Sequence, residues 1–273
     1  MATQRFNGAR YAFDEAGSGP PLLLLHGFTG SAANWRPLLP AFAAHLRVVA
    51  VDLLGHGRSA YPSDPARYRM PLAAADLLAL LDALAIERAH LLGYSMGGRL
   101  ALYTAVRFPQ RVASLILESS SPGLATQEER AARRAQDEAL ADWIEAHGVA
   151  AFVERWEQLP LWASQARLPL EQRAALRAQR LQNSPAGLAN SLRGMGTGAQ
   201  PSLWPRLPDL ALPTLLLAGA LDAKFAAIGR RMATALPRAR LEIVPDAGHT
   251  LHWERPLAFS QVLLEFLGSH KTT

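Results

Sequence analysis

The chain has 273 residues, 49% of them hydrophobic, and such a chain can bury one large core, so we expect one domain carrying an insertion. It contains no cysteine, which excludes disulfides, thiolate metal ligands and a cysteine nucleophile. The net charge of +5 comes from arginines spread along the chain without a basic block, a pattern that favours a small anionic substrate over nucleic acid.

The start of the sequence is not expected to act as a secretory signal. The first residues lack an apolar segment after basic residues. A membrane-spanning helix needs about 20 apolar residues in a row, and no apolar run in this sequence is nearly that long. We therefore expect a cytoplasmic protein without membrane insertion. No ligand cluster such as H-x-x-E-H occurs, so we expect no metal and no cofactor. The oligomeric state has no signature in the sequence.

The first part of the chain alternates strand and helix patterns. Asn7-Gly8 lies between alternating residues over 5–15 and predicts a hairpin. The apolar runs 21–25 and 47–52 are typical of buried parallel strands. Residues 70–84 place leucines at helical spacing and predict a helix.

The central motif is Gly93-Tyr94-Ser95-Met96-Gly97, which follows the apolar run 89–92 and precedes a helix pattern over 98–107. It fits G-x-S-x-G, in which a serine sits on a sharp turn between a strand and a helix. The glycines are needed because strand and helix approach closely at that turn. The motif predicts that Ser95 is the reactive hydroxyl.

Strand patterns then disappear from residue 119 to about residue 198 and return at 213–218 and 240–245, with a closing helix at 256–267. Alternating strands and helices predict a doubly wound, mostly parallel sheet with its site at the carboxyl ends of the strands. We divide the chain into a core of residues 1–118 and 199–273 and a helical cap of residues 119–198. The cap is expected to contain helices over 127–146, 149–158, 170–182 and 184–195.

A serine hydroxyl needs a histidine to accept its proton and an acid to orient that histidine. Asp222 follows the strand pattern at 213–218, and His249 follows the last strand, in the chain order Ser, Asp, His. These two residues are the predicted acid and base.

Other acids and histidines have different interpretations. Glu118 ends the strand after the serine helix and remains open as an alternative acid, whereas Asp246 is interpreted as a turn residue. His252 is expected at the cavity wall or the surface. His56, in the glycine-flanked run 53–59, is interpreted as a structural histidine bonded to local backbone.

The motifs resemble those of the α/β-hydrolase family. In that family the loop after the first parallel strand supplies one N–H of the oxyanion hole, which here implies Phe28 in the run His26-Gly27-Phe28, and the residue after the serine, Met96, supplies the other. Further runs resemble one branch, the 2-succinyl-6-hydroxy-2,4-cyclohexadiene-1-carboxylate synthases of menaquinone biosynthesis. These runs are residues 93–99, 117–124, 129–134 with Asp137, Phe152 with Trp156, 160–161, 191–198 and 222–225.

This resemblance implies a reaction. The family eliminates pyruvate from 2-succinyl-5-enolpyruvyl-6-hydroxy-3-cyclohexene-1-carboxylate, so Ser95, activated by His249 and Asp222, is expected to act as the base without an acyl-enzyme. The alternative is a carboxylesterase or carbon–carbon bond hydrolase in which Ser95 is the nucleophile. A binding protein on a hydrolase scaffold is disfavoured, because every catalytic position is filled.

The implied substrate carries three carboxylates, which arginines suit as ligands. Arg99 lies one helical turn after Ser95 and is the first candidate. Lys224 is interpreted as structural. In the cap, the candidate ligands are Arg130, Arg133 or Arg134, and Arg193, with Tyr94 and Trp156 as aromatic walls. The alternative for the cap arginines is a solvated position or pairing with Glu128, Glu129 or Asp137.

Overall fold

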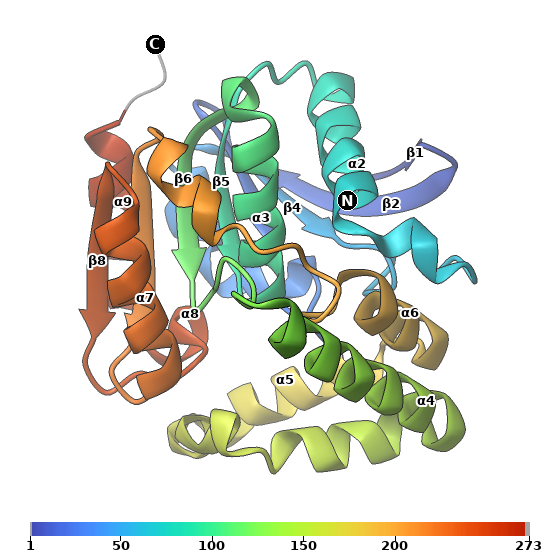
Figure 1. The fold of residues 1–273 in the computed structure, drawn as a ribbon. Helices are drawn as coiled ribbons and strands as arrows, with labels where there is room; N and C mark the ends of the chain where they lie inside the picture. Colours follow the sequence, from blue (N-terminus) through green and yellow to red (C-terminus); the bar gives the residue numbers. More distant parts are fainter. Residues whose placement is uncertain (1, 271–273) are drawn as a thin grey trace.

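The computed structural model describes residues 2–270, which form one sheet with helices on both faces and a helical layer at one end (Figure 1). The eight strands lie in the order β1-β2-β4-β3-β5-β6-β7-β8. Strand β2 pairs antiparallel with β1 and β4, and the remaining pairs are parallel. The strands are β1 (Ala2–Phe6), β2 (Ala9–Ala16), β3 (Pro21–Leu25), β4 (Arg47–Asp52), β5 (Ala89–Tyr94), β6 (Val112–Glu118), β7 (Thr214–Gly219) and β8 (Ala239–Val244).

The predicted hairpin joins β1 and β2. Asn7 and Gly8 both have positive φ, 46° and 84°. A two-residue hairpin turn of type I′ requires positive φ at both of its central residues. The other predicted strands agree with the structure to within two residues at either end.

The helices are α1 (Leu39–Ala43), α2 (Met70–Ala83), α3 (Met96–Arg107), α4 (Gln127–Glu157), α5 (Leu170–Leu181), α6 (Pro185–Met195), α7 (Ala223–Ala235), α8 (Leu251–Glu254) and α9 (Pro256–Gly268). Five 3-10 helices join them, namely η1 (Ala32–Leu38), η2 (Pro65–Tyr68), η3 (Pro109–Arg111), η4 (Pro160–Arg167) and η5 (Trp204–Asp209). The sequence patterns gave no indication of α7.

Successive residues of β3 divide the core between the two faces of the sheet. Leu23 and Leu25 pack with residues of α2, α3 and α7, whereas Leu22 and Leu24 pack with residues of α1 and α9. Side chains alternate along a strand, so a continuous run of leucines serves both layers.

Helices α4, α5 and α6 lie beyond the carboxyl ends of the strands, at the bottom of Figure 1, between β6 and β7 in the sequence. A separate apolar cluster joins α4 to α6, including Ile144, Phe152 and Leu188. Gly148, with φ of 78°, kinks α4 at the predicted break. We call this layer, with η4, the cap; the division of the chain into core and cap at residues 118 and 199 stays a prediction.

No helix within residues 2–270 combines the length and the apolar composition needed to cross a membrane.

Candidate active site

Ser95 lies on a strained turn between β5 and α3. Its φ is 50° and its ψ is −106°, a conformation that costs a non-glycine residue roughly 1–3 kcal/mol. A Cβ on Gly93 would lie 2.4 Å from the carbonyl oxygen of Gly97, and a Cβ on Gly97 would lie 2.2 Å from that of Leu25. The two glycines are therefore required, and the turn leaves the Ser95 side chain at the carboxyl end of the sheet.

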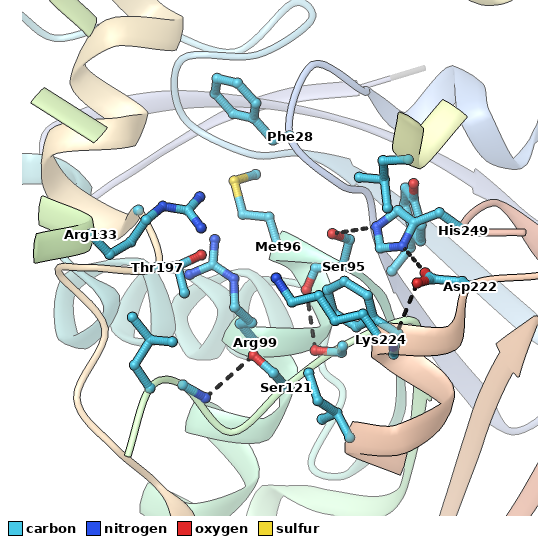
Figure 2. A pocket seen from close by; sticks show the side chains of 18 of the residues that line it. Phe28, Ser95, Met96, Arg99, Ser121, Arg133, Thr197, Asp222, Lys224 and His249 are labelled. Atoms are coloured by element: carbon cyan, nitrogen blue, oxygen red, sulfur yellow. Dashed lines mark hydrogen bonds and ion pairs between the residues drawn. The ribbon is translucent and has the colours of Figure 1, made fainter. Parts of the chain in front are cut away.

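Two further loops bring His249 and Asp222 to this serine (Figure 2). His249 Nε2 lies 3.1 Å from Ser95 Oγ, and His249 Nδ1 lies 2.6 Å from Asp222 Oδ2. The other Asp222 oxygen accepts from the backbone N–H of Phe225, 3.3 Å away, at the start of α7. Because a carboxylate only accepts hydrogen bonds, the Nδ1 proton faces Asp222 and Nε2 is free to accept from the serine hydroxyl. The structure thus brings the three predicted residues together.

The loop that carries His249 is held by Glu254, which the sequence analysis had not singled out. The Glu254 carboxylate accepts from the Gly248 N–H at 2.7 Å, the Thr250 N–H at 3.1 Å and the Thr250 hydroxyl at 2.8 Å. A glutamate five residues after a loop histidine carries no distinguishing sequence signal. Its contacts fix the backbone on both sides of His249.

Glu118 is engaged elsewhere, so its interpretation as an alternative acid is not supported. Both of its oxygens accept from His252 Nδ1, at 2.7 and 2.8 Å, and the two side chains are completely buried. The expectation that His252 lies at the wall or the surface is also wrong. The pair joins the end of β6 to the segment after His249 and packs beneath Tyr94, whose ring lies 4.8 Å from that of His252.

His26 and His56 have structural positions near the same site. His56 Nδ1 lies 3.0 Å from the Leu54 carbonyl oxygen, as predicted for a histidine bonded to local backbone. His26 accepts at Nε2 from the Leu53 N–H, 3.0 Å away, and so ties its loop to the end of β4. Burial lowers the pKa of both, that of His56 to about 3, so both rings are neutral near neutral pH.

Phe28 and Met96, the two predicted oxyanion donors, lie at the wall of one cavity with Ser95. Met96 is the first residue of α3, and N–H groups in a first helical turn have no partner within the helix. The Phe28 ring packs edge-on against two cap rings, Phe152 and Trp156, at centroid distances of 6.1 and 5.6 Å. The cap therefore contacts the residue that carries one of these N–H groups.

The cavity has a volume of about 820 Å³ and lies between the core and the cap. Five of its wall residues are arginine or lysine, namely Arg99 from α3, Arg133 from α4, Arg167 from η4, and Lys224 and Arg231 from α7. Figure 2 shows Arg99, Arg133 and Lys224 around the space beside Ser95. Tyr94 and Trp156 also line it, as predicted for aromatic walls.

Arg99 is a buried cation. Its Nη1 donates to the Met195 carbonyl oxygen at 2.9 Å and to Gln200 Oε1 at 3.1 Å. Burial lowers the pKa of the guanidinium to about 10. None of the ion pairs formed within residues 2–270 involves Arg99, and a guanidinium has five donors. Its remaining N–H groups are available to an anion.

Three of the predicted cap ligands lie outside the cavity. Arg130 donates to the carbonyl oxygens of Leu124 and Ala125, both at 3.1 Å. Arg134 is exposed and lies 3.4 Å from the Gly198 carbonyl oxygen. Arg193 pairs with three carboxylates of α4, those of Glu138, Asp142 and Glu145.

Arg133, the open alternative to Arg134, lines the cavity, as does Arg167 of η4. Arg133 Nε pairs with Asp137 at 2.7 Å. Arg133 lies seven positions before Leu140 and so shares its helix face. Leu140 lines the cavity as well.

Lys224, interpreted from the sequence as structural, lies at the cavity. It is exposed at the cavity wall, and its Nζ lies 5.6 Å from the centre of the Phe225 ring. None of the ion pairs within the described part of the chain includes it.

Residues 20–256 match the model of the alpha/beta hydrolase fold. The chain belongs to the α/β-hydrolase family. The fold and the resemblance predicted from the sequence are thereby confirmed.

Within the α/β-hydrolase family, several relatives share a name. The chain is 45% identical over 265 residues to a Bacillus subtilis (strain 168) protein named putative 2-succinyl-6-hydroxy-2,4-cyclohexadiene-1-carboxylate synthase, with 96% of each chain covered. It is 36% identical over 249 residues to the Serratia proteamaculans (strain 568) synthase of that name, covering 91% of this chain and 93% of the relative.

Two solved α/β-hydrolase structures are also similar. MenH from S. aureus superimposes with a TM-score of 0.91 at 37% identity, covering 95% of this chain and 98% of that one. A thermophilic esterase from Thermogutta terrifontis, solved with malate bound, gives a TM-score of 0.88 at 29% identity, covering 99% and 97%. Together with the fold, these relatives support an enzymatic role.

Proposed function

We propose that this enzyme eliminates pyruvate from 2-succinyl-5-enolpyruvyl-6-hydroxy-3-cyclohexene-1-carboxylate and forms 2-succinyl-6-hydroxy-2,4-cyclohexadiene-1-carboxylate. The names of the relatives support this reaction. The observation that carries the proposal is the buried Arg99 guanidinium, which shares a cavity with the hydrogen-bonded Ser95 and His249.

The charges of the cavity suit a substrate with several carboxylates. A buried cation without a carboxylate partner is costly unless it is paired, and a carboxylate of the substrate would supply the missing partner for Arg99. Arg133, Arg167, Lys224 and Arg231 add four cations from other elements. The volume of about 820 Å³ is within the range of cavities that enclose small molecules.

The chemistry begins at the ring carbon that carries the succinyl ketone. Ser95 takes the acidified proton from this carbon while His249 Nε2 accepts the proton of the serine hydroxyl. The electron pair shifts through the ring double bond, and the carbon–oxygen bond to the enolpyruvyl group breaks. The departing enolpyruvate takes up one proton and becomes pyruvate, so the two products together contain every atom of the substrate.

In the transition state, charge develops on the succinyl ketone oxygen. The N–H groups of Phe28 and Met96 are proposed to stabilise it. Asp222 holds the imidazole in the tautomer that accepts at Nε2 and stabilises the imidazolium once it forms.

Ester hydrolysis is the second candidate, and the similarity to the Thermogutta terrifontis esterase favours it. The same hydrogen-bonded serine can attack a carbonyl instead of taking a proton, because the geometry of the three residues is common to both reactions. Under this alternative, Ser95 would carry a covalent acyl group during turnover.

The test is pyruvate release from the named substrate by the wild type and by Ser95→Ala. We expect rapid release by the wild type and loss of that release in the variant, with both proteins folded by circular dichroism. Fast turnover of short p-nitrophenyl esters with little pyruvate release would favour the esterase instead.

A further inference from the structure

The C-terminal end of α5, in the cap, is bonded to the loop that carries Phe28. The Gln179 side-chain amide donates to Ser31 Oγ at 2.8 Å and to Asn34 Oδ1 at 2.6 Å. Two residues beyond the end of α5, Asn183 Nδ2 donates to the carbonyl oxygen of Thr29 at 2.8 Å. Asn183 and Thr29 are both buried. Three hydrogen bonds thus join the end of one cap helix to residues 29–34 of the core, the loop and the start of η1.

Thr29 has a backbone conformation that needs such support. The N–H of Gly30 donates to the Gly27 carbonyl oxygen at 3.0 Å, which closes a four-residue turn with Phe28 and Thr29 at its centre. The φ of Thr29 is 70°. This position of a turn favours glycine or asparagine, and a β-branched residue is strained there. A relaxed turn would move the Phe28 N–H that precedes it.

The same end of α5 also reaches the loop of His249. Arg180 Nη2 donates to Gln165 Oε1 at 3.0 Å, and Gln165 Nε2 donates to the Thr250 hydroxyl at 3.0 Å. Thr250 directly follows His249. One helix end therefore contacts the loop of the proposed oxyanion donor directly and the loop of the proposed base through one residue.

We infer that Asn183 is a positioning residue, which sets the Phe28 N–H in place by holding the Thr29 carbonyl group when α5 is seated on the core. The inference rests on the proposed function, since it requires that N–H to stabilise charge on the substrate. It predicts that the oxyanion hole is complete only when the cap is docked. Asn183 acts through Thr29 and does not line the cavity.

The direct test uses Asn183→Ala, which removes the donor, and Gln182→Ala as a matched control, because Gln182 is the neighbouring exposed amide. Deleting one oxyanion-hole donor lowers kcat by about 100-fold to 1000-fold, so a displaced donor is expected to lower it by roughly 10-fold to 100-fold. KM should change by less than about 3-fold, because the lost interaction belongs to the transition state. Gln182→Ala should match the wild type in both constants. A wild-type kcat in Asn183→Ala, or a rise in KM alone, would overturn the inference.

A second measurement separates this inference from the proposed reaction. Amide hydrogen exchange of residues 27–31, without substrate, should be faster in Asn183→Ala than in the wild type and unchanged in Gln182→Ala. If the wild type releases no pyruvate, the proposed function fails, but this exchange still tests the contact. Unchanged exchange in Asn183→Ala would overturn the positioning role. If that variant does not fold, Gln179→Ala removes the two adjacent contacts to the same loop, and the same outcomes apply.

Discussion

The hydroxyl oxygen of Ser95 lies 3.1 Å from Nε2 of His249, although 154 positions separate the two residues in the chain. The serine hydroxyl can lose its proton only if an acceptor stands at this distance. We therefore expect His249→Ala to lower kcat for pyruvate release by about 1000-fold or more. Steady-state kinetics of the folded variant check this, and a kcat within about 10-fold of the wild type would contradict it.

Asp222 and Glu118 are expected to have different effects when each loses its charge. Asp222→Asn should lower kcat by about 1000-fold or more, because the amide favours the wrong imidazole tautomer. Glu118→Gln should retain much more activity but lower the free energy of unfolding by roughly 1–3 kcal/mol, because it disturbs a buried pair with His252. Steady-state kinetics and urea unfolding of both variants measure the two effects. Equal losses of kcat in the two variants would argue that Glu118 also orients His249.

The cations of the cavity give a third prediction. Arg99→Met or Arg133→Met should lower kcat/KM by roughly 10-fold to 100-fold, as expected for the loss of a charged hydrogen bond to a carboxylate. Lys224→Met should act in the same direction. Arg134→Gln is the matched control, because Arg134 neighbours Arg133 on α4 but lies outside the cavity. If the control loses as much activity as Arg133→Met, the loss reflects the overall charge of the protein. Arg133 would then not be a ligand of the substrate.

A fourth prediction concerns stability. Burial, with a smaller effect of the Arg88 charge, lowers the pKa of His90 to about 4. The unfolded chain takes up a proton on this ring below about pH 6.5, whereas the folded chain does not. The stability that depends on neutral His90 is therefore fully present above about pH 6.5. Below that pH the free energy of unfolding falls by about 1.4 kcal/mol per pH unit because of this residue.

Urea unfolding of the wild type and of His90→Gln at several pH values between about 7 and about 4.5 tests this slope. The variant should lose stability less steeply with falling pH, whatever its stability at neutral pH. Identical slopes would show that His90 takes up its proton equally in both states.

The core and the three residues at Ser95 could be predicted from sequence because their signals are local. The G-x-S-x-G turn admits only glycine at Gly93 and Gly97, and the apolar run of β3 fills both layers of the core. Asp222 and His249 follow buried strands, and the ends of parallel strands meet at one edge of the sheet. The positions of these residues along the chain were enough to bring them together.

The cap arginines and the supporting residues were less predictable because their positions depend on packing between distant elements. Arg133 and Arg134 differ by one residue, about 100° around α4, and only the face that packs on the core decides which of them meets the cavity. Glu254 and Asn183 act through contacts with other segments. No spacing along the sequence indicates those contacts.

The most direct test of the central claim is to quench the wild-type enzyme during turnover of 2-succinyl-5-enolpyruvyl-6-hydroxy-3-cyclohexene-1-carboxylate, quantify pyruvate and weigh the intact chain by mass spectrometry. If Ser95 acts as a base, one pyruvate appears for each substrate consumed and the chain keeps its unmodified mass. A covalent adduct on Ser95 during turnover, or substrate consumption without pyruvate, would contradict the account.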